Sequence, residues 1–238
     1  VVERALAIFQ ADCDPAAHRD LTRWSPSNPY GYGPPPPGFQ PITTSGGVTS
    51  TVAFTSPLRL AGAFGFELFS APEAALRHSD ALLGLLSRAG PGDQVDVEQM
   101  YEYRAWGAMP DNTPAPNLRL EAYIAAARRG AAVRILLNSG SFGESFYDIS
   151  KNLDTVAYVN DLARREGLNL RARLGDPTRY GIHNKMVLVR LGGRGYAHIG
   201  SINGSETSSK INREVAVQIA SDAVYQYLEE MFEWDWYH

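Results

Sequence analysis

From Gly62 onward, short apolar segments alternate with amphipathic segments, and this alternation constrains the fold more than any other feature of the sequence. Strands are expected at 64–70, 94–103, 133–137, 168–173, 185–189, 196–199 and 214–219. Helices are expected at 73–88, 118–129, 155–165 and 221–234. The glycine-rich turn between 185–189 and 196–199 predicts a hairpin. The pattern therefore predicts an α/β fold with a mixed β-sheet sandwiched between helices.

Composition excludes several kinds of protein. The chain has 238 residues, 44% of them hydrophobic, which is enough to bury a sizeable core. Its net charge of -4 gives no overall attraction to polyanions, so nucleic acid is not an expected partner. A single cysteine, Cys13, excludes an internal disulfide and a cysteine zinc site, and the redox compartment stays open. No apolar run is long enough to predict a transmembrane segment.

The beginning of the chain resembles its end. Residues 1–9 predict a short helix, and Phe9-x-x-Asp12 repeats the spacing of Phe232-x-x-Asp235 in the last predicted helix. We interpret 1–14 as the tail of a preceding copy of the same unit, and we expect the true N-terminus to lie upstream. Residues 15–62, rich in proline and glycine, predict a linker or a lid over a cleft.

A group of polar residues surrounds the predicted hairpin. His183 and Lys185 enter its first strand two residues apart, so both project to the same side. Ser201 and Asn203 follow its second strand, and Glu214 opens the next one. The set offers an imidazole nucleophile or acid, a cation and neutral donors for phosphate oxygens, and a carboxylate able to fix an imidazole tautomer.

These residues resemble the signature of the phospholipase D superfamily, the HKD phosphodiesterases, in the order His-x-Lys at 183–185, Gly-Ser-x-Asn at 200–203 and then Glu214. The resemblance covers 63–238, which we identify as one phospholipase D-type catalytic lobe, most like the C-terminal half of a bilobal bacterial enzyme. The family motif continues to an aspartate, and this chain has Arg190 there. That departure puts local ion pairing and efficiency in doubt, and Asp176 is a candidate substitute.

The resemblance implies a mechanism without metal or cofactor in which two such motifs face each other. One histidine attacks phosphorus to give a phosphohistidine, and the other protonates the leaving alcohol. It assigns catalysis to His183, Lys185 and Glu214 and phosphate binding to Lys185, Ser201 and Asn203, with the acid role more usual for the C-terminal histidine. No second His-x-Lys pair occurs in the chain, so another lobe or an identical subunit must supply it.

Other residues received secondary interpretations. Packing is expected for His198, and surface positions for His18 and His78. The segment 205–210 predicts a loop, either solvated or bordering the phosphate site. Trp106, Met109 and the prolines at 110, 114 and 116 suggest an apolar rim, whereas Arg128 and Arg129 are expected to offset a helix dipole.

The leading function from sequence is hydrolysis or transfer of phospholipid headgroups. The alternatives are a nuclease acting as a homodimer, against which the net charge argues, and a degenerate, non-catalytic lobe, for which Arg190 argues. Neither the headgroup nor the choice between hydrolysis and transfer follows from the sequence. The resemblance favours secretion, while the sequence itself leaves the localisation open.

Overall fold

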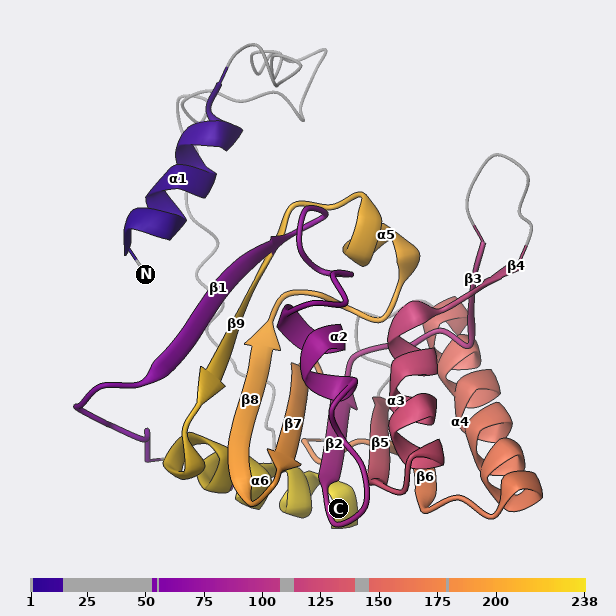
Figure 1. Ribbon diagram of the computed structural model, residues 1–238. Coiled ribbons are helices and arrows are strands. Elements are labelled where there is room, and N and C mark those ends of the chain that lie inside the picture. Colours follow the sequence, from indigo (N-terminus) through magenta and orange to yellow (C-terminus); the bar gives the residue numbers. More distant parts are fainter. Residues whose placement is uncertain (1, 15–52, 55, 108–113, 140–145, 179) are drawn as a thin grey trace, which may run out of the picture. The chain divides into compact units, whose positions relative to one another are not determined.

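The computed structural model describes residues 2–14, 53–54, 56–107, 114–139, 146–178 and 180–238, with backbone only for 146–148 (Figure 1). The chain divides into two units, Val1–Thr49 and Ser50–His238. The described part of the first unit contains helix α1, Val2–Asp12, so the predicted short helix is confirmed. Most of the predicted linker or lid, 15–62, lies outside the described residues, and the interpretation of 1–14 as a tail stays a prediction.

The second unit is built on a seven-stranded mixed sheet with the order β1-β9-β8-β7-β2-β5-β6. Its strands are β1 Gly65–Ala71, β2 Gln94–Gln99, β5 Ala132–Asn138, β6 Leu170–Gly175, β7 Lys185–Leu191, β8 Arg194–Gly200 and β9 Glu214–Ala220. A separate ribbon pairs β3 Ala105–Gly107 with β4 Pro114–Pro116. Neighbouring strands from β1 to β2 in this order pair antiparallel, whereas β2 pairs parallel with β5, and β5 with β6. All seven predicted strands and the hairpin are confirmed.

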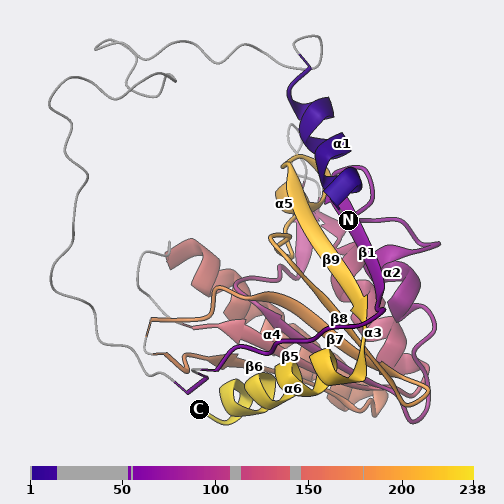
Figure 2. The same cartoon turned by 90° about the vertical axis from the view of Figure 1, so that its left-hand side faces the viewer.

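Helices cover both faces of the sheet, as Figures 1 and 2 show. One face carries α2 Ala81–Leu86, α3 Leu118–Arg128 and α4 Phe146–Glu166, and the other carries α6 Asp222–Tyr237. Strand β7 shows why both faces are covered, because its successive side chains alternate between them. Val187 packs in the cluster under α2 to α4, and Met186 packs in the cluster with Phe232 of α6. The predicted sandwich is therefore confirmed.

The predicted helix at 73–88 is wrong over its first half. Residues 72–76 form turns and 78–80 a bend, so only α2 is helical. The bend brings Ser79 so close to Gly84 that a Cβ there would lie 2.9 Å from the Ser79 carbonyl carbon. Ala81 has a positive φ of 53°, which marks the sharp start of α2. Ser79 and Asp80 favour such turns, and this local preference overrides the helical periodicity.

The predicted loop at 205–210 is also wrong, because Glu206–Lys210 forms helix α5. The Ser205 hydroxyl caps it by accepting a hydrogen bond from the Ser208 backbone N–H at 3.1 Å. Strand β2 ends earlier than predicted, at Gln99, and α4 begins before the predicted 155. Among the described residues, no helix is long and apolar enough to cross a membrane.

Candidate active site

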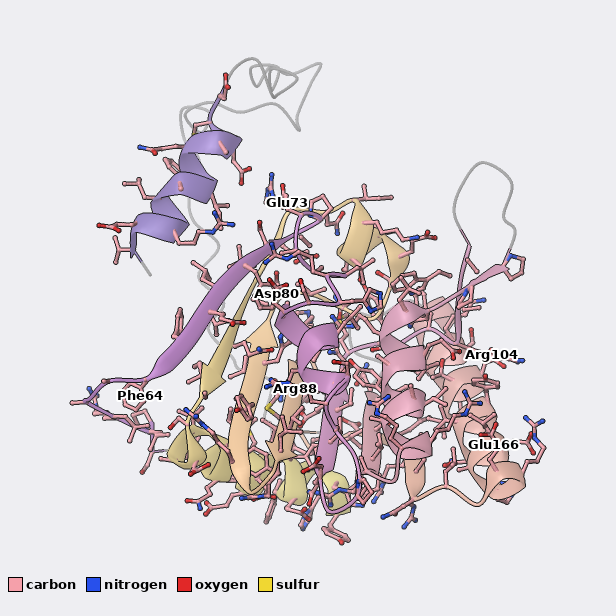
Figure 3. All side chains as sticks on the ribbon, in the orientation of Figure 1. Phe64, Glu73, Asp80, Arg88, Arg104 and Glu166 are labelled. Carbon is pink, nitrogen blue, oxygen red and sulfur yellow. The ribbon has the colours of Figure 1, made fainter. Side chains whose placement is uncertain are left out.

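Four strand ends meet at one edge of the sheet. Strand β2 ends at Gln99, opposite Lys185 at the start of β7. On the other side of β7, β8 ends at Gly200, and Gly200 pairs with Ala216 near the start of β9. Antiparallel order thus brings the two segments of the predicted motif to the same edge. Just beyond it, Arg213 donates to the carboxylate of Glu73 at 2.5 Å, and Glu73 is labelled in Figure 3.

His183 and Lys185 converge at this edge. The Lys185 ammonium nitrogen Nζ lies 3.0 Å from Nδ1 of His183 and 2.7 Å from the His183 carbonyl oxygen. Lys185 is only 8% exposed, whereas the His183 side chain is exposed. The predicted projection of both residues to one side is therefore confirmed. A buried cation beside an accessible imidazole suits an anionic substrate that approaches from solvent.

The charge state of His183 follows from this contact. Partial burial, and then the Lys185 ammonium, lower the pKa of His183 below its ordinary value. Because an ammonium can only donate, Nδ1 accepts in this arrangement, and the neutral ring carries its proton on Nε2. The imidazole is thus neutral near pH 7, and it must exchange its Nδ1 partner before it can take up a second proton.

The segment before Lys185 is held by three backbone contacts. The Asn138 side chain at the end of β5 accepts from the Ile182 N–H at 2.7 Å. The Asp176 carboxylate accepts from the Gly181 N–H at 2.6 Å, and the Met100 N–H donates to the carbonyl of Asn184 at 3.0 Å. Asp176 therefore fixes the loop that leads into the motif. Its suggested role as a substitute for the motif aspartate stays a prediction.

The other predicted site residues occupy the same edge with different partners. Ser201 bridges to β9, since its hydroxyl accepts from the Val215 N–H at 3.2 Å. Asn203 is 8% exposed, and its Oδ1 has no hydrogen-bond partner within the described part of the chain. Glu214 accepts from the Ser208 hydroxyl at 3.2 Å and from the Asn212 amide at 3.4 Å.

The register decides on which face these side chains lie. Met186, Ile199 and Val217 are partners across β7, β8 and β9, and Met186 packs towards α6. Side chains alternate along a strand, so Lys185 and Glu214 both point to the opposite face, towards α2 to α4. The His183 ring contacts Lys185, and the predicted role of Glu214 in fixing an imidazole stays a prediction.

Arg190, which stands in place of the motif aspartate, belongs to a different environment. It lies towards the far end of β7, on the face covered by α6. Its guanidinium donates to the Glu229 carboxylate at 3.0 Å and lies 4.2 Å from the Tyr225 ring centroid. An ion pair and a cation–π contact thus fix Arg190 on α6, away from the imidazole.

A buried polar cluster holds the segment that follows β8. Glu102 is fully buried and accepts from the Asn117 amide at 2.5 Å, with Arg119 at 3.8 Å. The Trp106 ring is 1% exposed, and its Nε1 donates to the Gly204 carbonyl at 3.1 Å. The predicted apolar rim is therefore wrong for Trp106, because the indole is used to hold the chain after β8. Met109 and Pro110 lie outside the described residues, and Pro114 and Pro116 are exposed in β4.

The remaining histidines and arginines behave largely as expected. His198 is buried and stacks on Phe69, and burial lowers the pKa of His198 to about 3, so the packing role is confirmed. His78 is exposed, although in a bend, and His18 lies outside the described residues. Arg128 pairs at 2.7 Å with Glu166, which is labelled in Figure 3, and the expected offset of a helix dipole by Arg128 and Arg129 stays a prediction. No group of three or more metal-ligating side chains occurs within the described ranges.

The sequence did not predict the residues that hold the motif segment through hydrogen bonds. Asn138, Met100 and Asn184 hold the segment, and Glu98 in β2 binds the Asn184 amide at 2.7 Å. In the alternating segment Val95-Asp-Val-Glu98, the acidic positions suggest a solvent-facing side. The sequence signal that could have predicted burial of Glu98 is the apolar face of the last helix, because that helix covers this side of the sheet.

Comparison with known proteins identifies relatives. The family model described as "Cardiolipin synthase, PLD-like domain" matches residues 99–236. No curated protein matches the chain significantly.

Comparison with solved structures finds resemblances. One is to the phospholipase D family member Nuc from Salmonella typhimurium, at 18% identity and a TM-score of 0.46 over 73% of this chain and 95% of that one. NucT from Helicobacter pylori has 19% identity and a TM-score of 0.49, over 73% and 96%. The phosphatidylserine synthase of Haemophilus influenzae has 12% identity and a TM-score of 0.48, over 76% and 40%.

Proposed function

The chain belongs to the family described as "Cardiolipin synthase, PLD-like domain". We propose that it contributes one half of a phosphodiesterase site that hydrolyses or transfers phospholipid headgroups. The matched region, 99–236, contains all five residues predicted for the site. The observation that carries the proposal is the convergence of Lys185 on His183 at the edge where β7, β8 and β9 meet.

The reaction divides one displacement into two steps. In the first, Nε2 of one histidine attacks phosphorus, the bond from phosphorus to the leaving alcohol breaks, and a second histidine gives that alcohol a proton. In the second step, water or another alcohol attacks phosphorus and gives its proton to the second histidine, and the bond from phosphorus to Nε2 breaks, which releases the first histidine. We assign the proton-donating role to His183, and the attacking histidine to a second motif in another lobe or an identical subunit.

Lys185 and Asn203 would bind the phosphoryl oxygens, on which negative charge accumulates as the bond breaks. An ammonium that is 8% exposed acts with little screening by water, which strengthens its attraction to those oxygens. Arrival of a phosphate would also draw Lys185 away from Nδ1 of His183. That nitrogen would then be able to hold the proton that an acid needs, with Glu214 as the candidate carboxylate for it.

A phospholipid substrate agrees with two observations. The description of the matching family names a cardiolipin synthase, and cardiolipin is a phospholipid. The net charge of -4 provides no overall attraction to a nucleic acid backbone. The chain also retains the His-x-Lys and Gly-Ser-x-Asn residues, which argues against the degenerate lobe.

The substrate assignment is tested by incubating the chain, alone and together with a second motif-bearing half, with phosphatidylcholine vesicles and with plasmid DNA. We expect release of choline when both motifs are present, and plasmid that stays supercoiled. Added EDTA should not change the rate, because the proposed steps use no metal. Nicking of the plasmid by the chain alone would instead favour the dimeric nuclease. Absence of both choline release and nicking would favour the non-catalytic lobe.

A further inference from the structure

Asn184, the residue between the two motif side chains, is tied to the interior from the opposite face of the sheet. Because side chains alternate, His183 and Lys185 project to one side and Asn184 to the other. The Asn184 amide Nδ2 donates to Oε1 of Glu98 at 2.7 Å, and its backbone carbonyl accepts from the Met100 N–H at 3.0 Å. The motif backbone is therefore tied to the Met100 backbone and, through the Asn184 side chain, to a buried carboxyl group.

Glu98 is an unusual choice for the middle of a sheet. It is 0% exposed, and it pairs in register with Met186, which packs against α6. Its second oxygen, Oε2, receives no donor from any residue that the structure describes. An ionised carboxylate with an unsatisfied oxygen at this depth would be costly, so a compensating feature is required.

That feature is Asp235 of α6, whose carboxyl group lies close enough to Glu98 for each to shift the pKa of the other. Two neighbouring carboxylates repel each other when both are ionised, so the protonated form of one member of the pair is favoured. Burial, and then the nearby Asp235, raise the pKa of Glu98 well above its ordinary value. A protonated Glu98 keeps its contact with the motif, because Oε1 still accepts from the Asn184 amide.

We propose that Glu98, held by Asp235, is a positioning residue that fixes Asn184 and thereby keeps Lys185 in contact with the His183 ring. The chain of contacts runs from α6 through β2 to the segment before β7 without touching substrate. Its importance for turnover rests on the proposed function, whereas its effect on the His183 ring does not. The spacing Phe232-x-x-Asp235, singled out from the sequence, thereby gains a role: Phe232 anchors α6 in the core and Asp235 reaches Glu98.

The test compares Glu98→Leu, which keeps the side-chain volume and loses the hydrogen bond to Asn184, with Glu98→Gln, whose amide oxygen can still accept from Asn184. Asp96→Asn is the matched control, because Asp96 is equally buried on the same strand and face but binds Arg134 at 2.7 Å. The pKa of His183 is measured by histidine NMR titration of each folded variant. That readout needs no turnover, so it tests positioning even if the chain cleaves no phosphodiester.

In Glu98→Leu, the pKa of His183 should rise towards its ordinary value, because Lys185 no longer stays against the ring. Glu98→Gln should restore the wild-type pKa, and Asp96→Asn should not change it. In an assembly that turns over, Glu98→Leu should lower kcat by roughly 10²-fold with little change in KM, as expected for misplacement of a reacting group.

An unchanged His183 pKa in Glu98→Leu would overturn the proposal, as would an equal rise in Asp96→Asn, which would indicate general loosening of the sheet. If Glu98→Leu does not fold, Asn184→Ala removes the same hydrogen bond from its half-exposed end and must give the same rise. If the variants shift the pKa of His183 as predicted but the wild-type assembly shows no turnover, the proposed function is contradicted and the positioning role of Glu98 is not.

Discussion

At the scale of single residues, the site is defined by the buried Lys185 ammonium, which lies 3.0 Å from Nδ1 of the exposed His183 ring. The two-residue spacing of His183 and Lys185 was sufficient to place both on one side of β7, because strand geometry is periodic. The contact of Lys185 with Nδ1 depends on a side-chain rotamer, which spacing does not determine. Arg190 illustrates the same limit: its motif position suggested the site, yet it faces α6.

Removal of the Lys185 charge should alter the titration of His183. In Lys185→Met, we expect the pKa of His183 to rise, because the neighbouring ammonium that disfavours the imidazolium is lost. Histidine NMR titration measures the change. Lys210→Met is the control, since Lys210 pairs with Glu206 at 2.7 Å and is exposed. A His183 pKa that stays the same or falls in Lys185→Met would show that the contact does not control the ring.

At the scale of elements, apolar patterns located the strands well and the short helices poorly. In β5, the consecutive residues Ile135, Leu136 and Leu137 are buried on both faces and leave little choice of structure. The segment 73–88 has helical periodicity, but Ser79 and Asp80 bend it, and packing of α2 decides its length. Glu98 was missed for a related reason, because burial of one sheet face depends on a helix that is distant in sequence.

The turn after β8 provides a test of packing at this scale. A Cβ on Gly204 would lie 2.2 Å from the buried Glu102 carboxylate, so Gly204→Ala should cost about 2–3 kcal/mol or more of unfolding free energy. Denaturant unfolding measures the loss. At Gly90, the nearest atom to an added Cβ is 3.7 Å away, so Gly90→Ala should stay within about 0.5 kcal/mol of wild type. Equal effects of the two substitutions would contradict the packing described around Glu102.

At the scale of the whole molecule, a single sheet presents one His-x-Lys pair, one Gly-Ser-x-Asn segment and Glu214 at one edge. The mixed sheet and its two helical layers were predictable, because alternating strands and helices admit few other arrangements. The proposed mechanism requires a second histidine, and the sequence of this chain did not predict whether another lobe or an identical subunit would supply it. The proposed function requires above all that His183 is a reacting group in a shared phosphodiesterase site.

The most direct measurement of that claim is the rate of phosphatidylcholine hydrolysis by the assembly with both motifs, comparing His183→Asn with His78→Asn, an exposed histidine in a bend. We predict that His183→Asn lowers kcat by about 10³-fold or more, with a Tm within a few degrees of wild type, because the side chain is exposed and contributes little to packing. His78→Asn should keep the wild-type rate. Turnover by His183→Asn at a rate near that of wild type, or an equal loss in both variants, would contradict the account.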